Sequence, residues 1–124
     1  FSFEYHYRPA REQLRKIYTS CDIFLCASWY EGLGLTAMEA MACRCTLVTT
    51  DTGGCLEYAI NGQTALVSPS RDIDSLSQNL VRLLDDEILL KTLSENGCQK
   101  IAEFEWEKSC DQLISLFKEG QSRN

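Results

Sequence analysis

The sequence contains no run of about eighteen apolar residues that would span a membrane. It also lacks a charged segment followed by an apolar one, which would mark a secretory signal. It has one histidine, His6, and none of its seven cysteines forms a Cys-x-x-Cys pair. Zinc sites use paired clusters of cysteine and histidine, so no metal site is expected. His6 is interpreted as an ordinary surface or half-buried residue.

Basic residues are outnumbered, with 12 Lys and Arg against 18 Asp and Glu and a net charge of −6. Nucleic-acid-binding domains usually show the opposite balance, which argues against a nucleic-acid partner. The acidity also argues against docking on anionic lipid, so no membrane contact is expected from this part of the protein. An odd number of cysteines in apolar stretches indicates free thiols that are buried as small hydrophobic groups. Such thiols favour a reducing compartment, the cytoplasm.

The length of 124 residues suits one small domain with one core. At the start, Phe1, Phe3, Tyr5 and Tyr7 alternate with polar residues, which predicts a strand from the first residue. Since a domain rarely begins so abruptly, we expect the chain to be cut from a longer protein. We assign residues 1–119 to a partial domain and 120–124 to a polar tail.

Short apolar or β-branched runs then alternate with amphipathic ones. Strands are predicted at 22–27, 46–50 and 65–67. Helices are predicted at 10–20, 36–43, 73–84, 88–104 and 106–117, with a helical turn at 56–60 and Asp72 as a start signal. This alternation predicts an α/β fold, a parallel sheet covered by helices on both faces. Three or four strands are few for such a sheet, so its first strands are expected upstream of residue 1.

Residues 22–43 form a unit of strand, glycine loop and helix, which is the part of an open parallel sheet where ligands bind. Gly32 and Gly34 carry no side chain, so the backbone there can approach a ligand and present its amides. The helix that follows offers unpaired N–H groups and a positive dipole end. These features together indicate a phosphate site.

Two glutamates flank this loop, Glu31 before it and Glu39 in the helix, with seven residues between them. Facing a phosphate they would repel it, so they suit hydroxyl groups such as those of a ribose and a sugar. A sugar nucleotide has both. Two simpler interpretations remain open: Thr36 and Glu39 form a capping box, and Glu31 is a solvated loop residue. Met38 is assigned to the core together with Met41.

The run at 31–42 resembles the Glu-x7-Glu motif of the group 1 retaining glycosyltransferases, which have the two-domain GT-B fold. The resemblance also covers 14–22, Ser28, 51–57, 61–69 and 104–107, nearly the whole chain. It implies a Rossmann-like sheet flanked by helices, the C-terminal, nucleotide-sugar-binding domain of a GT-B enzyme.

The resemblance also implies roles for single residues. Glu39 would bind the ribose hydroxyls of the donor, and Glu31, the candidate catalytic residue, would contact the transferred sugar. The backbone of four loop residues, with Thr36, would lie against the sugar and diphosphate: Gly32, Leu33, Gly34 and Leu35. Three further residues would shape the wall of the site: Gly53, Gly54 and Glu57.

The activity implied is transfer of a hexose from a nucleotide-diphosphate sugar, a substrate rather than a cofactor, without a metal. The setting implied is polysaccharide biosynthesis in the cytoplasm, peripheral to the membrane as a full-length protein. Basic residues and an acceptor domain upstream are expected partners in catalysis, so this chain alone would bind but not turn over. A catalytically inactive partner or scaffold is the alternative, and an unrelated phosphate-binding module is a third reading.

The sequence departs from the family pattern after the motif helix. Arg44 and Thr46 stand where the family commonly has Gly and Pro, and Ala65 stands where it often has Gly. A glycine at a helix end usually adopts a left-handed conformation, which arginine holds less comfortably. We therefore expect either a different helix end or a specificity feature at Arg44.

Overall fold

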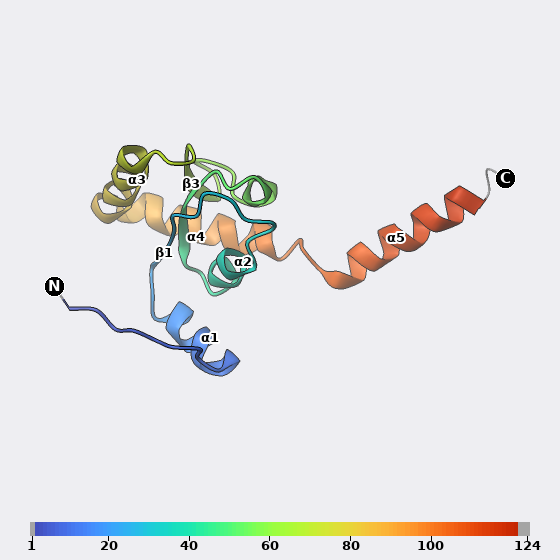
Figure 1. Ribbon diagram of the computed structural model, residues 1–124, viewed down its shortest axis with the longest axis horizontal. Coiled ribbons are helices and arrows are strands. Elements are labelled where there is room, and N and C mark those ends of the chain that lie inside the picture. The colour runs from blue at the N-terminus through green and yellow to red at the C-terminus, as the bar shows by residue number, and fades with distance from the viewer. Residues whose placement is uncertain (1, 122–124) are drawn as a thin grey trace.

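Residues 2–121, which the computed structural model describes with side chains as far as residue 118, contain a parallel sheet in the order β1-β2-β3 (Figure 1). Its strands are β1 (Ile23–Cys26), β2 (Thr46–Thr50) and β3 (Ala65–Ser68). The helices are α1 (Arg11–Thr19), α2 (Leu35–Ala42), α3 (Ile73–Asp85), α4 (Glu87–Ile101) and α5 (Trp106–Gln121). A single 3-10 turn, η1 (Gly54–Glu57), follows β2.

The central strand of the sheet is β2, and all five of its residues are buried. In the register Leu47 lies opposite Phe24 on one side and Ala65 on the other. We expected β1 to be buried on both faces, and this is wrong, because Leu25 is 47% exposed. Within the described residues β1 is an edge strand, and an edge lacks the covering that a central strand receives.

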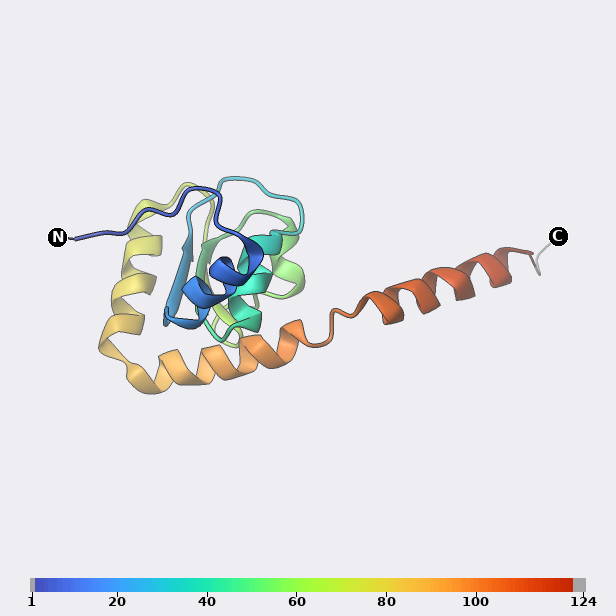
Figure 2. The same cartoon turned by 90° about the horizontal axis from the view of Figure 1, so that it is seen from below.

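Helices cover both faces of the sheet. On one face α2 places Met38 and Met41 against Leu47 and Tyr58. On the other face α3 and α4 pack against β2 and β3 through one hydrophobic cluster, whose buried members are Val48, Leu66, Leu76, Leu83 and Leu93. Figure 2 shows α4 running along one end of the sheet, toward α2. The α/β fold expected from the alternating pattern is confirmed, and so is the core role of Met38 and Met41.

Aspartate side chains cap the starts of α3 and α4. Asp72 caps α3 by accepting a 2.9 Å hydrogen bond from the amide of Ser75, which confirms the predicted start signal. Asp86 caps α4 in the same way through the amide of Leu89. Threonines inside the sheet also find partners, as when Thr46 Oγ1 donates to the carbonyl of Leu90 at 2.9 Å. Buried polar groups that are paired in this way do not weaken the core.

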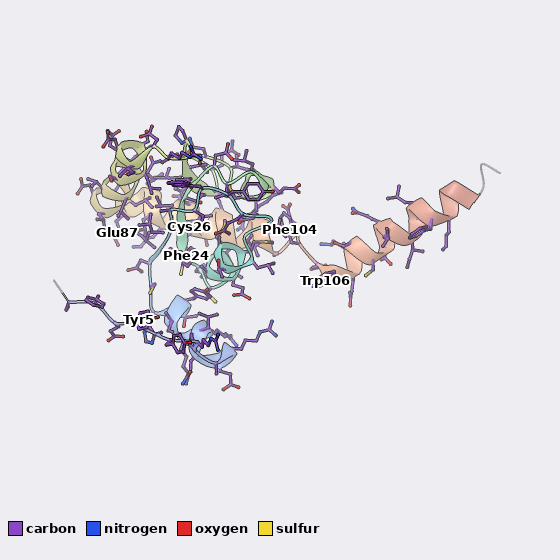
Figure 3. All side chains as sticks on the ribbon, in the orientation of Figure 1. Tyr5, Phe24, Cys26, Glu87, Phe104 and Trp106 are labelled. Atoms are coloured by element: carbon purple, nitrogen blue, oxygen red, sulfur yellow. The ribbon has the colours of Figure 1, made fainter. Side chains whose placement is uncertain are left out.

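The predicted opening strand is wrong for the residues described. Residues 2–10 form no strand, and Phe3, Tyr5 and Tyr7 are 71–81% exposed. The segment lies apart from the sheet, with Tyr5 beside α1 on the side of the N-terminus (Figures 1 and 3). Alternation defines two faces of a segment, but a strand also needs a neighbour to pair with. Phe1 lies outside the described residues.

The last helix, α5, projects away from the rest of the molecule (Figures 1 and 2). Its first residue, Trp106, is 86% exposed. The helix runs to Gln121, so residues 120 and 121, assigned to a polar tail, are helical; residues 122–124 lie outside the described part. Within residues 2–121 no helix has the length and apolarity to cross a membrane.

The cysteines are all free, as expected, but they are less buried than predicted. Only Cys45 and Cys55 are fully buried, while Cys21 and Cys110 are exposed. Cys45 donates to the carbonyl of Tyr18 at 3.1 Å. Burial raises the pKa of its thiol to about 11, and the neighbouring side chains of Cys21, Cys43 and Asp22 add to this rise. An apolar sequence neighbourhood does not fix burial at the ends of elements, where Cys21 lies.

Arg44 occupies the left-handed conformation, with φ of 69°, just after α2. This conformation costs an L-residue about 1–2 kcal/mol. Glycine avoids that cost, but its greater freedom in the unfolded state lowers the free energy of unfolding by about 0.5–1 kcal/mol. The side chain contributes little in return, because its ion pair with Glu95 is exposed at 4.0 Å. Arg44→Gly is therefore expected to raise the free energy of unfolding by about 0.5–1 kcal/mol, measured by urea unfolding.

Arg44→Ala is the matched control, because it removes the same side chain while keeping the Cβ that makes this conformation unfavourable. It is expected to give no gain. An equal gain in both variants would show that the side chain, and not the backbone conformation, is the source of the strain.

Candidate functional site

Two glycine loops meet at the carboxyl edge of the sheet, residues 27–34 after β1 and 51–54 after β2. The amide of Glu31 donates to the carbonyl of Thr52 at 3.3 Å, and Glu31 forms a parallel bridge with Gly53. Gly54 lies directly against Gly32, so close that a Cβ on Gly54 would overlap the Gly32 carbonyl group. The second loop therefore packs closely against the first and holds it in place.

The carboxylate of Glu31 is half-buried and turned toward its own loop. Oε1 accepts a 2.6 Å hydrogen bond from the hydroxyl of Ser28 and a 3.7 Å one from the thiol of Cys26, which ends β1 (Figure 3). Oε2 lies 3.2 Å from the position of a Cβ on Gly34, and among the described residues it accepts no hydrogen bond. One oxygen is thus fixed by the loop, and the other remains an acceptor beside the start of α2.

Gly34 is the N-cap of α2, with φ of 76°, and no side chain of the described part of the chain caps the helix. Thr36 lies inside the helix, so the capping box of Thr36 and Glu39 is wrong. The Gly34 carbonyl accepts a hydrogen bond from the hydroxyl of Tyr58 at 3.2 Å, which fixes the turn from the core. The first amides of α2 therefore have no side-chain partner at the end where the loop meets the helix, as an anion site requires.

Glu39 is exposed and lines a cavity of about 400 Å³ between α1 and α2. The other lining residues are Arg11, Glu12, Leu14, Arg15, Tyr18, Ala42 and Cys43. Burial, and after it the carboxylate of Glu39, raises the pKa of Tyr18, which places the phenol and the carboxylate in one electrostatic environment. Glu31 is not among the lining residues, so the two glutamates do not share this cavity.

The remaining site residues named from the sequence surround the loops. Gly53 has φ of 93°, and its amide donates to Asp51 Oδ1 at 2.9 Å, so glycine suits this position. Glu57 is exposed in η1, and Leu33 and Leu35 are exposed beside the glycines. Leu33 and Leu35 lie with Gly32 and Gly34 at the carboxyl edge of the sheet. Glu57 is the last residue of η1, the turn that follows Gly53.

The contacts that hold Glu31 were not predicted from the sequence. Ser28 was recognised only through the family resemblance, while in the structure it donates to Glu31 and its carbonyl accepts from the hydroxyl of Thr50. A serine three residues before an acidic residue is a possible signal for the first contact. Nothing in the sequence pairs Ser28 with Thr50, because the contact joins the ends of two strands.

The sequence matches the family model described as "Glycosyl transferases group 1" over residues 3–100. The chain belongs to the group 1 glycosyltransferase family. One relative of the chain is the N,N'-diacetylbacillosaminyl-diphospho-undecaprenol alpha-1,3-N-acetylgalactosaminyltransferase of Campylobacter jejuni. It is 30% identical over 112 residues, which are 90% of this chain and 30% of the relative.

Two solved structures show the same fold. Sucrose-phosphate synthase from Thermosynechococcus elongatus has a TM-score of 0.77 at 30% identity, covering 91% of this chain and 29% of that one. The C-terminal domain of a group 1 family glycosyltransferase from Francisella tularensis has a TM-score of 0.73 at 25% identity, covering 80% and 51%. The fold is thus that of a GT-B C-terminal domain. The chain spans about a third or less of the length of its curated relatives.

Proposed function

We propose that this group 1 chain is the donor-binding part of a retaining glycosyltransferase. The full protein would transfer a sugar from a nucleotide-diphosphate sugar to a glycan or lipid-linked acceptor. The observation that carries the proposal is Glu39, which caps nothing and lines a cavity of about 400 Å³. Within residues 2–118 the Glu39 carboxylate has no hydrogen-bond or ion-pair partner, and a carboxylate of this kind beside a helix that begins at a glycine loop suits a ligand with both hydroxyl groups and phosphates.

The geometry supports an extended placement of the donor along α2. The base lies in the cavity against apolar side chains such as Leu14 and Ala42, and the ribose hydroxyls donate to Glu39. Glu39 is five residues past the N-cap, about 8 Å along the helix axis, which leaves room for the diphosphate at the amides of 32–36. The sugar then reaches Oε2 of Glu31, while Oε1 keeps its bond to Ser28.

In such a transfer the diphosphate leaves with growing negative charge, and stabilising this charge is the main catalytic task. The positive end of α2 contributes to it. The basic side chains and acceptor domain implied by the family are expected outside this chain, so the chain binds the donor without turnover. The C. jejuni relative carries a diphospho-undecaprenol acceptor in its name, which supports a lipid-linked acceptor in polysaccharide assembly. The presence of both glutamates favours this function over an inactive scaffold.

The proposal predicts that UDP, GDP or ADP binds the chain and raises its unfolding temperature with concentration. Glu39→Gln is expected to weaken this binding by about tenfold or more, because a charged acceptor of two hydroxyl groups is replaced by a neutral one. Isothermal titration calorimetry measures the affinity, and circular dichroism checks that the variant is folded.

Glu12→Gln is the matched control, since it removes the same charge from the α1 wall of the same cavity. Its affinity is expected to stay within about twofold of the parent. A folded Glu39→Gln with unchanged affinity would refute the ribose role. A parent chain that no nucleoside diphosphate stabilises at millimolar concentration would refute donor binding itself.

A further inference from the structure

The loops that follow β1 and β3 meet through Trp29 and Arg71, 42 residues apart in the chain. The guanidinium carbon of Arg71 lies 4.7 Å from the centroid of the Trp29 ring. The hydroxyl of Ser70 donates to the carbonyl of Trp29 at 3.2 Å. Trp29 nevertheless remains 66% exposed. The pair therefore forms a fixed but accessible surface of one aromatic ring and one cation.

Arg71 is held in an unfavourable backbone conformation. Its φ is 68°, in the left-handed region that L-residues other than Asn and Asp rarely adopt. The neighbouring carboxylate, Asp72, is engaged as the cap of α3 by the amide and hydroxyl of Ser75. No ion pair of Arg71 occurs among the residues that the structure describes. Strain kept at a residue whose charge is not neutralised points to a function.

The chemistry of this surface selects a ligand. A guanidinium has its donors in one plane and binds a carboxylate or phosphate through two parallel hydrogen bonds. Arg71 lies over part of the indole, and the rest of the side chain, 66% exposed, offers a rigid apolar surface against which a ring of similar size can pack beside the guanidinium. Ile73, 74% exposed, lines a small cavity with both residues. This cavity, about 40 Å³, is too small for a sugar, so a ring would lie over Trp29 at the surface.

The surface is joined to the glutamate loop through the backbone. Trp29 is flanked by Ser28, whose hydroxyl donates to Glu31 at 2.6 Å and whose carbonyl accepts from Thr50. Thr50 also lines the small cavity with Trp29 and Arg71. Trp29 is therefore two residues along the chain from Glu31, the carboxylate proposed to contact the transferred sugar.

We propose that Trp29 and Arg71 form a subsite for an anionic sugar, a pyranose ring that stacks on the indole and carries a phosphate or carboxylate on the guanidinium. That this sugar is the acceptor rests on the proposed function, whereas its binding here does not. The subsite is separate from the cavity at Glu39, so the two are lost independently.

The test uses the chain with Trp106→Phe, which leaves Trp29 as the single tryptophan. Trp29 fluorescence and calorimetry follow titrations with glucose 6-phosphate and with glucuronate, and with glucose and inorganic phosphate as comparison ligands. Both anionic sugars are expected to bind saturably, and each about tenfold or more tighter than glucose or phosphate alone. A preference between the two distinguishes a phosphate site from a carboxylate site.

Arg71→Gly is the decisive variant, because glycine accepts the same backbone conformation and the fold is retained. It is expected to weaken binding of the anionic sugars by about tenfold or more. Arg44→Gly is the matched control: it removes one positive charge at a second left-handed arginine, with φ of 69°, outside the subsite. Its affinity is expected to be unchanged.

Four results would overturn the proposal. They are no saturable signal at millimolar sugar phosphate, unchanged affinity in Arg71→Gly, an equal loss in Arg44→Gly, and glucose binding as tightly as its phosphate. UDP affinity is measured in the same variants. An equal loss of UDP and sugar phosphate in Arg71→Gly would assign the surface to the donor instead. Failure of UDP, GDP and ADP alike to bind the parent chain refutes the donor proposal and leaves this test intact.

Discussion

Gly54→Ala is expected to lower the free energy of unfolding by about 3 kcal/mol or more. A Cβ on Gly54 would overlap the carbonyl oxygen of Gly32 and lie 2.6 Å from its carbon. Both are backbone atoms, and the amide of Glu31 holds their loop to Thr52, so neither can rotate away as a side chain would. The two loops would have to separate, and Glu31 would move with them. Urea unfolding followed by circular dichroism measures the loss.

Gly32→Ala is the matched control, because it changes the other partner of the same contact. A Cβ on Gly32 meets no atom within 4 Å, and its φ is not in the left-handed region. Its stability is expected to stay within about 0.5 kcal/mol of the parent. Equal effects of the two substitutions, or a neutral Gly54→Ala, would contradict the close packing of the two loops.

Most of the regular elements were predictable, because their periodicity reflects burial. The β-branched run at β2 gave a strand with the predicted bounds, and the leucines of α3 gave a helix that begins one residue after Asp72. The start of α2 was displaced by one residue, since Gly34 and not Thr36 makes the turn into the helix. A capping motif in the sequence competes with a glycine that adopts the left-handed conformation, and here the glycine prevailed.

The sequence predictions that failed concern contacts between elements, which a local sequence pattern does not reveal. The aromatic alternation at residues 3–7 defines a face, but no strand of the described chain lies beside it. The amphipathic pattern of α5 predicted a helix, and its apolar residues Leu116 and Phe117 are 65% and 67% exposed. A sequence pattern states which side of an element is apolar and leaves open what covers that side.

The sequence predicted that the glutamates and glycines of the candidate site lie in the loop after β1 and in α2, and their ligand roles stay predictions. The family motif gave Glu31 and Glu39, but their separate surroundings follow from tertiary packing. Glu31 is held by Ser28 in its own loop, whereas Glu39 faces a wall supplied by α1. The contact between Trp29 and Arg71 had no signal, because the Arg71 conformation and its distance to Trp29 both require the fold.

The packing that supports this site depends on Tyr58, and Tyr58→Ala is expected to lower the free energy of unfolding by about 3–5 kcal/mol. The side chain is fully buried, and its ring meets Phe104, three residues past the end of α4, edge to face with centroids 6.3 Å apart. Its hydroxyl donates to the carbonyl of Gly34. Truncation leaves a cavity under the N-cap of α2, so donor binding is expected to weaken as well. Urea unfolding and UDP titration measure the two losses.

Tyr58→Phe separates the ring from the hydroxyl. It keeps the packing and loses one hydrogen bond, so the free energy of unfolding is expected to fall by about 1 kcal/mol. A loss as large as that of alanine would show that the hydroxyl, and not the ring, holds the turn.

Burial raises the pKa of Tyr58 above its ordinary value of 10.0. The native state therefore favours the neutral phenol, whose contribution is complete below pH 10 and is lost as the pH rises above it. Phenylalanine cannot ionise, so above pH 10 the stability of Tyr58→Phe is expected to fall less steeply than that of the parent.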